Sequence, residues 1–166
     1  MVATVNRDNN ITGKIEKWEA HKKGILHKGF TIILTYNGQY LLQHRKHPAF
    51  DDTFDLTISS HPLYIDNILQ DDETAIYQAL ERELHLAKKD LVAKPQYKGT
   101  VWYKAKDRKS SFIEHEMDAI YVAEIKRVPD PDPEYSYDLI LQSRDQLKDN
   151  NLAPWVESFL KDNVLI

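Results

Sequence analysis

The 166-residue chain contains no cysteine. It therefore has no disulfides, no thiolate zinc site and no cysteine nucleophile. It also lacks any run of about 18 apolar residues, the length that a helix needs to cross a bilayer. Residues 1–11 are polar and do not contain the apolar segment of a secretory signal. We therefore expect a cytoplasmic protein that does not associate with a membrane.

The chain also lacks a strong excess of charge of either sign. Its 22 Lys and Arg residues against 26 Asp and Glu residues give a net charge of −4. Such a surface offers no basic footprint for nucleic acid, so nucleic-acid binding is not expected. With 42% hydrophobic residues and no repeats, a chain of this length can bury one core. We expect residues 1–166 to form a single domain, with residues 1–12 flexible.

Apolar and β-branched runs predict several strands. Residues 29–35 and 40–43 flank Asn37-Gly38, a dipeptide that favours the tight turn of a β-hairpin. Three further runs are typical of strands, at residues 99–104, 112–125 and 135–141. Residues 50–60 read as irregular, with one short strand. Strands and helices alternate irregularly, which indicates an α/β or α+β fold with a mixed sheet.

Three helices are predicted from caps and periodicity. One begins after Asp71 or Asp72, runs to about Leu86, and has an apolar stripe at helical spacing. Ser143 and Gln146 form a capping-box pattern for a short helix, and Pro154 suits the first turn of a terminal helix. Glu83 falls on the edge of the first helix's apolar stripe. It is either a carboxylate at the solvent rim or a ligand aimed into a site.

A pair of glutamates is the strongest chemical signal. Glu114 and Glu116 point to the same face of a strand, about 7 Å apart, because side chains alternate and two strand rises separate them. Two such carboxylates are compatible either with a solvated face or with a cation between them. His21, His27 and His61 complete a set that suits a mixed nitrogen–oxygen metal site with one open position. Spacing alone does not bring these segments together.

Four other histidines do not fit this pattern. His115 alternates away from the two glutamates, so we expect it to be packed rather than to bind a metal. We expect His44, His47 and His85 to be ordinary surface or loop residues.

Four segments of the chain resemble the type I isopentenyl-diphosphate isomerases of the Nudix superfamily. They occur in the family's order and at nearly its spacing, and weaker matches at residues 102–105 and 153–155 extend the similarity over residues 13–160. The four are GKIEKWEAH (residues 13–21), LHKGF (26–30), SSHP (59–62) and EHE (114–116).

The resemblance implies a Nudix-type α/β/α sandwich with an elaborated active site. Glu83 would help to hold a second Mg²⁺ on the substrate diphosphate. Lys17 and Arg45 would contact the diphosphate, and Trp155 would face a developing carbocation. The resemblance also implies that one Mn, Mg or Zn ion is held by five residues, namely His21, His27, His61, Glu114 and Glu116.

In the family's reaction a double bond moves as one proton is added and another is removed on the opposite face. Tyr103 and Glu116 match the pair that handles one proton, and Ser59 stands where the family has the cysteine that handles the other. A free thiol has a pKa of about 8.5, and a serine hydroxyl is a weaker acid by several units. Each unit is worth about 1.4 kcal/mol, so this substitution predicts weakened turnover.

Other positions depart from the family as well. Residues 54–57, Phe-Asp-Leu-Thr, replace a Trp-Thr-Asn-type approach to the cysteine. Ala79 stands where the family carries an arginine, and a second diphosphate lysine is absent or replaced by Lys46. The sequence ERELHL at residues 81–86 lacks the glycine and the paired downstream glutamates of Nudix diphosphate hydrolases.

These observations favour an isopentenyl-diphosphate isomerase-like protein that acts on a small-molecule diphosphate. Two alternatives stay open, namely a Nudix-type hydrolase of another diphosphate and a non-catalytic protein that binds a metal or a prenyl diphosphate. We expect a monomer or a weak homodimer.

Overall fold

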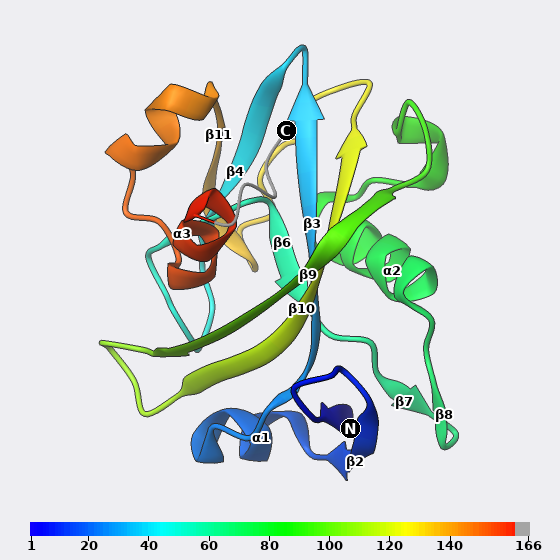
Figure 1. Ribbon diagram of the computed structural model, residues 1–166. Helices are drawn as coiled ribbons and strands as arrows, with labels where there is room; N and C mark the ends of the chain where they lie inside the picture. The colour runs from blue at the N-terminus through cyan, green and yellow to red at the C-terminus, as the bar shows by residue number, and fades with distance from the viewer. Residues whose placement is uncertain (162–166) are drawn as a thin grey trace.

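The computed structural model describes residues 1–161 (Figure 1). Nine strands form one mixed sheet, in which β11, β4, β3, β1 and β2 are consecutive neighbours and β10 joins β3 to β9. The strands of this sheet are β1 (Val2–Val5), β2 (Ile11–Ile15), β3 (His27–Tyr36), β4 (Gln39–Arg45), β5 (Phe54–Asp55), β6 (Ile58–Ser60), β9 (Gln96–Lys106), β10 (Ile113–Glu124) and β11 (Ser136–Gln142). A small separate hairpin consists of β7 (Tyr64–Ile65) and β8 (Ile68–Leu69).

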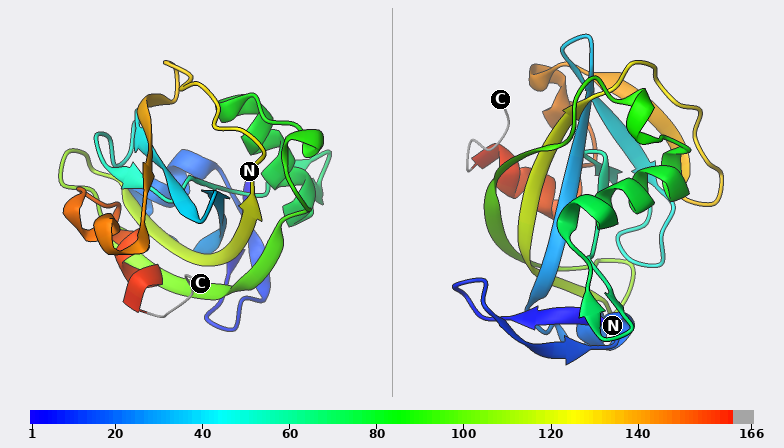
Figure 2. Two further views of the ribbon diagram at one scale, coloured as in Figure 1. Left: turned by 90° about the horizontal axis from the view of Figure 1, so that it is seen from above. Right: turned by 90° about the vertical axis from the view of Figure 1, so that its right-hand side faces the viewer.

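Helices cover both faces of the sheet. They are α1 (Lys17–Lys23), α2 (Asp72–Leu84) and α3 (Pro154–Lys161), with two 3₁₀ turns, η1 (Lys88–Asp90) and η2 (Arg144–Asp149). Helix α2 packs on one face of β3, and α3 lies on the other side of the sheet (Figures 1 and 2). This layered arrangement confirms the predicted mixed-sheet α/β fold. None of the helices in residues 1–161 has the length and apolar character needed to cross a membrane.

Strand β3 is the centre of the molecule because both of its faces are buried. Ile32 and Leu34 pack in the core beneath α2, whereas Ile33 packs in the second core with Trp155 and Phe159 of α3. A strand covered on both faces reads as a continuous apolar run rather than an alternating one, which is the pattern of residues 29–35.

The neighbours of β3 place the functional residues. The predicted hairpin joins β3 to β4 through Asn37 and Gly38, which both have positive φ. On its other side β3 runs parallel to β10, and this register sets His27 opposite Glu116. Strand β9 pairs antiparallel with β10 and sets Tyr103 opposite the same glutamate. Three of the residues selected from the sequence therefore lie side by side across three strands.

The N-terminal segment, for which the sequence predicts flexibility, forms β1 and the start of β2. Residues 2–5 form β1, which pairs with β2 and touches β3 at the pair Thr4 and His27. Val2 and Ala3 are fully buried, and Val2 also forms a β-bridge with Leu63. Burial of these small apolar side chains and pairing of the backbone order the segment. The signal was weak in the sequence because the strand has only four residues.

Helix α1 was not predicted, and it carries two site residues. The Glu16 side chain caps it by accepting a hydrogen bond from the Glu19 backbone N–H, and Gly24 ends it in the left-handed conformation. Lys17 and His21 lie four residues apart, so both project from one side of this short helix.

The other predicted helices are confirmed with small changes. Asp71 is the N-cap of α2, which ends at Leu84 rather than at about Leu86 because His85 adopts a left-handed C-cap. The Ser143–Gln146 capping box is present, but the segment that it begins is a 3₁₀ turn, η2.

Candidate metal centre and adjoining cavity

The structure brings the three histidines and two glutamates together. One side-chain ligand atom from each of the five residues lies within 4.8 Å of all the others. The residues come from α1, β3, the turn after β6, and β10, and each is at most 8% exposed. The group consists of His21, His27, His61, Glu114 and Glu116.

The distances within this group match those between ligands of one ion. His61 Nε2 lies 2.6 Å from Glu116 Oε1, and His27 Nε2 lies 3.2 Å from the same oxygen. His21 Nε2 is 3.0 Å from Glu114 Oε2, and the Nε2 atoms of His27 and His61 are 3.1 Å apart. Two ligand atoms that are each about 2.1 Å from an ion, at right angles, are separated by about 3.0 Å. The donor set therefore fits a divalent cation.

Backbone carbonyl groups orient two of the imidazole rings. The Nδ1 atom of His21 lies 2.6 Å from the Lys17 carbonyl oxygen, and that of His27 lies 2.7 Å from the Ile25 oxygen. An Nδ1–H that donates to a carbonyl leaves the lone pair on Nε2, which faces the centre of the group. This is the usual arrangement around metal-binding histidines.

Burial and neighbouring charges shift the pKa values of the group. Burial lowers the pKa of His61 to about 3, against the opposing pull of Glu116, so its imidazole is neutral at neutral pH. Burial and the charge of Glu116 raise the pKa of Glu114. For Glu116 burial acts upwards, but His61 and His27 outweigh it and hold the pKa well below the ordinary value. Neutral imidazoles and a carboxylate are the forms that bind metal.

Gly29 allows the close approach of strand β3 to Glu116. A Cβ atom at position 29 would collide with the Oε2 atom of that glutamate. Any larger residue would displace the carboxylate, so the glycine of the LHKGF segment has a direct role in the geometry of the centre.

Tyr103 lies against the candidate metal centre. Its hydroxyl donates to Glu116 Oε2 over 2.7 Å, and the side chain is almost fully buried. Burial and the charge of Glu116 raise the pKa of Tyr103 well above its ordinary value. The phenol therefore keeps its proton and donates it in this hydrogen bond to the glutamate.

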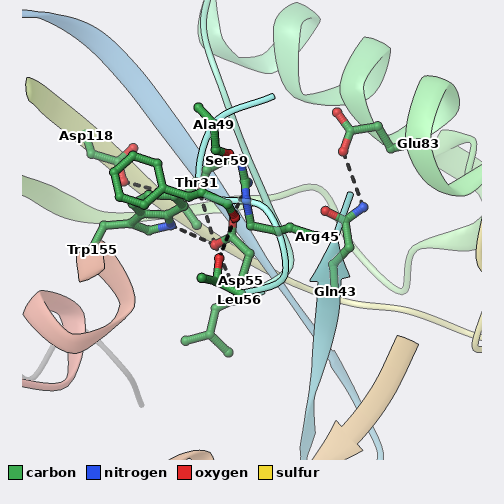
Figure 3. Close-up of polar contacts among 12 residues, drawn as sticks. Thr31, Gln43, Arg45, Ala49, Asp55, Leu56, Ser59, Glu83, Asp118 and Trp155 are labelled. Atoms are coloured by element: carbon green, nitrogen blue, oxygen red, sulfur yellow. Dashed lines mark hydrogen bonds and ion pairs between the residues drawn. The ribbon is translucent and has the colours of Figure 1, made fainter. Parts of the chain in front are cut away.

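Ser59 belongs to a buried polar network that the sequence did not predict (Figure 3). Its hydroxyl donates to Asp55 Oδ1 over 3.1 Å and lies 2.8 Å from Thr31 Oγ1. Thr31 in turn contacts Asp118 at 2.8 Å. Burial and the nearby Glu116 raise the pKa of Asp118 well above its ordinary value. Asp118 continues the same-face series of Glu114 and Glu116, so strand alternation was a signal that could have identified it.

Arg45 and Trp155 meet in this network rather than at an open surface. Arg45 Nη1 donates to Asp55 Oδ2 over 2.8 Å, and Trp155 Nε1 donates to Asp55 Oδ1 over 2.8 Å (Figure 3). The two side chains are 4% and 1% exposed. Neither residue is among those that line the cavity described below. The cause is Asp55, whose buried carboxylate collects both donors.

A cavity of about 360 Å³ opens beside the metal centre. Ser59 and His61 line it on one side and Lys17 and Trp18 of α1 on another. The remaining walls are formed by α2 and by the segments after β4 and before β11, which contribute Ala75, Gln78, Arg82, Glu83, Lys46, His47, Glu134 and Tyr135.

Glu83 is a buried cavity residue rather than a solvent-rim carboxylate. It is 2% exposed, and it accepts hydrogen bonds from Arg82 Nη2 over 2.6 Å and from Gln43 Nε2 over 3.4 Å. It lies outside the five-residue group.

The structure also places three residues that lie outside the five-residue group, and one of them is where the sequence predicted it. His115 is packed, as predicted, with Nδ1 2.9 Å from the Gly24 oxygen and Nε2 accepting from Trp102 Nε1. His47 lines the cavity, although we expected an ordinary loop histidine. Arg82 was not selected from the sequence at all, because a single arginine on a helix carries no distinctive pattern.

No protein-family model matches the chain. It is similar to curated proteins named isopentenyl-diphosphate Delta-isomerase. The protein of Rhodobacter capsulatus is 26% identical over 90% of this chain and 85% of its own length. The protein of Aliivibrio fischeri is 30% identical over 74% of this chain and 67% of its own length.

Solved structures resemble the fold at lower identity. A Deinococcus radiodurans protein matches with a TM-score of 0.72 at 12% identity, covering 97% of both chains. A MutT Nudix hydrolase from Burkholderia pseudomallei matches with a TM-score of 0.63 at 19% identity, covering 82% of this chain and 96% of its own. At these identities the similarity shows a Nudix-type fold alone.

Proposed function

Because the chain belongs to the isopentenyl-diphosphate Delta-isomerase family, we propose that it is a metal-dependent enzyme that interconverts isopentenyl and dimethylallyl diphosphate. The observation that carries this proposal is the buried group of three histidines and two glutamates with Tyr103 bonded to Glu116. A fold alone would not support it, since one fold hosts many chemistries.

In this proposal His21, His27, His61, Glu114 and Glu116 hold one Mn, Mg or Zn ion, and Glu83 holds a Mg²⁺ that accompanies the diphosphate. A divalent ion bound by these residues would supply positive charge that offsets the buried carboxylates. The geometry supports these assignments through the distances among the five residues and the burial of Glu83 at the cavity.

In the proposed reaction, three residues of the chain add or remove protons at the double bond. Tyr103 donates its hydroxyl proton to Glu116 across a 2.7 Å hydrogen bond, and this pair would exchange a proton with one face of the double bond. Ser59 lines the cavity and would act on the other face. Its hydroxyl is a weaker acid than a thiol, so we propose that turnover is slow.

The first test is an assay of double-bond migration. The protein is incubated with isopentenyl diphosphate and Mg²⁺ or Mn²⁺, and both dimethylallyl diphosphate and released phosphate are measured. Migration supports the isomerase. Release of phosphate or pyrophosphate without migration would instead support a Nudix-type hydrolase, and tight binding without either product would support a non-catalytic binding protein.

A Ser59→Cys variant tests whether the serine hydroxyl slows isomerisation. We expect isomerisation to increase about tenfold or more, since each pKa unit recovered is worth about 1.4 kcal/mol of barrier at most. Ser60→Cys is the matched control, because Ser60 is the next residue and also lines the cavity. Equal activity of wild type and Ser59→Cys would show that the pocket, rather than the missing thiol, limits the reaction.

A further inference from the structure

We propose that Arg82, together with Lys17, holds the diphosphate of the substrate in this chain, and that Arg45 does not. The identity of the ligand rests on the proposed function. The anion site itself rests on the cavity and on the side chains around it.

The Arg45 side chain is buried, and its guanidinium makes its contacts in the interior of the protein. Its Nη1 donates to Asp55 Oδ2 over 2.8 Å, its Nη2 donates to the Ala49 carbonyl oxygen over 3.3 Å, and its guanidinium carbon lies 5.1 Å from the Trp155 ring centre. It does not line the cavity, and moving it there would leave the Asp55 carboxylate buried without its cation. Breaking a buried pair in this way is strongly unfavourable.

Arg82 is positioned to replace it. Ala75, Gln78 and Arg82 follow one another at helical spacing along the side of α2 that lines the cavity. Ala79, where the resemblance implies an arginine, precedes Arg82 by three residues, so the two project from neighbouring positions one turn apart. Arg82 lines the cavity, whereas Ala79 is buried in the core beneath the helix.

Most hydrogen-bond donors of the Arg82 guanidinium have no protein partner within residues 1–161. Its Nη2 donates to Glu83 Oε1, and no other partner of this group occurs within residues 1–161. Its side chain is 44% exposed, so it is accessible to a ligand from solvent. By contrast, the third cation at the cavity, Lys46, donates its ammonium to the Pro133 carbonyl oxygen over 2.6 Å.

Lys17 connects Arg82 to the metal centre. Lys17 of α1 lines the same cavity as Arg82 and Glu83 of α2, and His61 of the five-residue group lines it as well. An anion between Lys17 and Arg82 would therefore lie next to the five-residue group and next to Glu83. That position suits a diphosphate, since it carries several negative charges and a guanidinium can bind two of its oxygens at once.

The test measures binding of inorganic pyrophosphate in the presence of Mg²⁺ by calorimetry, for the full chain and its variants. We expect Arg82→Ala to weaken binding tenfold or more, and Arg82→Lys to weaken it less because it keeps the charge. Arg127→Ala is the matched control, since Arg127 is also a half-exposed arginine paired with one carboxylate, Asp90, and does not line the cavity. It should bind as the wild type does.

With isopentenyl diphosphate as substrate, Arg82→Ala should raise KM by a similar factor and change kcat less. Binding by Arg82→Ala within twofold of the wild type, an equal loss in Arg127→Ala, or no pyrophosphate binding by the wild type at millimolar concentration would each overturn the proposal. If the wild type binds pyrophosphate through Arg82 but does not move the double bond, the anion site stands and the isomerase proposal fails. If the wild type moves the double bond but its KM does not depend on Arg82, the isomerase proposal stands and the anion site fails.

Discussion

Asp55 is the residue that most changes the environment of the site. Its carboxylate accepts hydrogen bonds from the Arg45 guanidinium, the Trp155 indole, the Leu56 backbone N–H and the Ser59 hydroxyl. Because these donors neutralise a fully buried charge, removing any one of them is unfavourable. One aspartate therefore gathers an arginine, a tryptophan and the Ser59 hydroxyl in the interior.

His47 gives a pH-dependent prediction at the scale of one side chain. Burial, together with the positive charges of Arg45, Lys17 and Arg82, lowers its pKa from the ordinary value of 6.5 to about 2. Below pH 6.5 the unfolded chain therefore binds a proton at this residue that the folded chain does not bind. The contribution of His47 makes the protein less stable as the pH falls from about 6.5 towards 2, by at most about 1.4 kcal/mol per pH unit.

The measurement compares wild type with His47→Gln by urea unfolding between pH 7 and pH 4. We expect the unfolding free energy of the wild type to fall relative to that of the variant as the pH is lowered. His44→Gln controls for the loss of a histidine from the same region, since His44 pairs with Asp52 and does not line the cavity. A constant difference between wild type and His47→Gln over this range would contradict the prediction.

At the scale of elements, α2 serves both the core and the cavity. Ile76, Leu80 and Leu84 are buried against the sheet, whereas Gln78 and Arg82 line the cavity. The periodicity of 3.6 residues per turn separates these two stripes along one helix. The position of Arg82 and Glu83 at the cavity therefore depends on how firmly α2 is formed and packed.

The N-cap of α2 provides a test of that dependence. The Asp71 carboxylate accepts hydrogen bonds from the Thr74 backbone N–H and the Thr74 hydroxyl. We expect Asp71→Ala to lower the unfolding free energy by about 1 kcal/mol, and Asp71→Asn to have a much smaller effect because Asn also caps helices. Both variants are measured by urea unfolding.

Glu73→Ala is the control for the loss of a first-turn carboxylate, because Glu73 lies in the first turn without being the cap. A loss in Glu73→Ala as large as that in Asp71→Ala would show that charge near the helix terminus, rather than the cap hydrogen bond, is responsible.

At the scale of the whole molecule, the candidate metal centre draws its residues from α1, β3, β10 and the turn after β6. A cation that binds these elements only in the folded state should stabilise the entire chain. At a metal concentration of 100 times Kd the gain is about 2.7 kcal/mol. For a domain of this size that corresponds to an increase in Tm of about 5–10 °C.

This is measured by thermal unfolding of chelator-treated protein with and without Mn²⁺, Mg²⁺ or Zn²⁺. His61→Ala should reduce the increase in Tm, whereas His115→Ala should retain it, because His115 packs against Gly24 and Trp102 outside the group. The metal-centre proposal would be contradicted by an unchanged Tm of the wild type with all three metals.

Much of this protein follows from its sequence alone. The buried strand and its Asn37-Gly38 turn, the capped α2 and the same-face pair Glu114 and Glu116 are local patterns, because periodicity and turn chemistry act over a few residues. Residue chemistry selected the three histidines as possible ligands, and the likeness of four short segments to one family implied that they bind one ion. The signals for β1, β2 and α1 were too short to detect, since each of these elements depends on contacts with distant residues.

Only the tertiary structure decided which side chains meet. The parallel register of β3 and β10 sets His27 beside Glu116, and no pattern within either segment encodes that register. The Arg45–Asp55 pair and the opening of Arg82 into the cavity depend in the same way on segments that are distant in sequence. Buried charges select their partners by three-dimensional proximity and desolvation, and these quantities exist only in the folded chain.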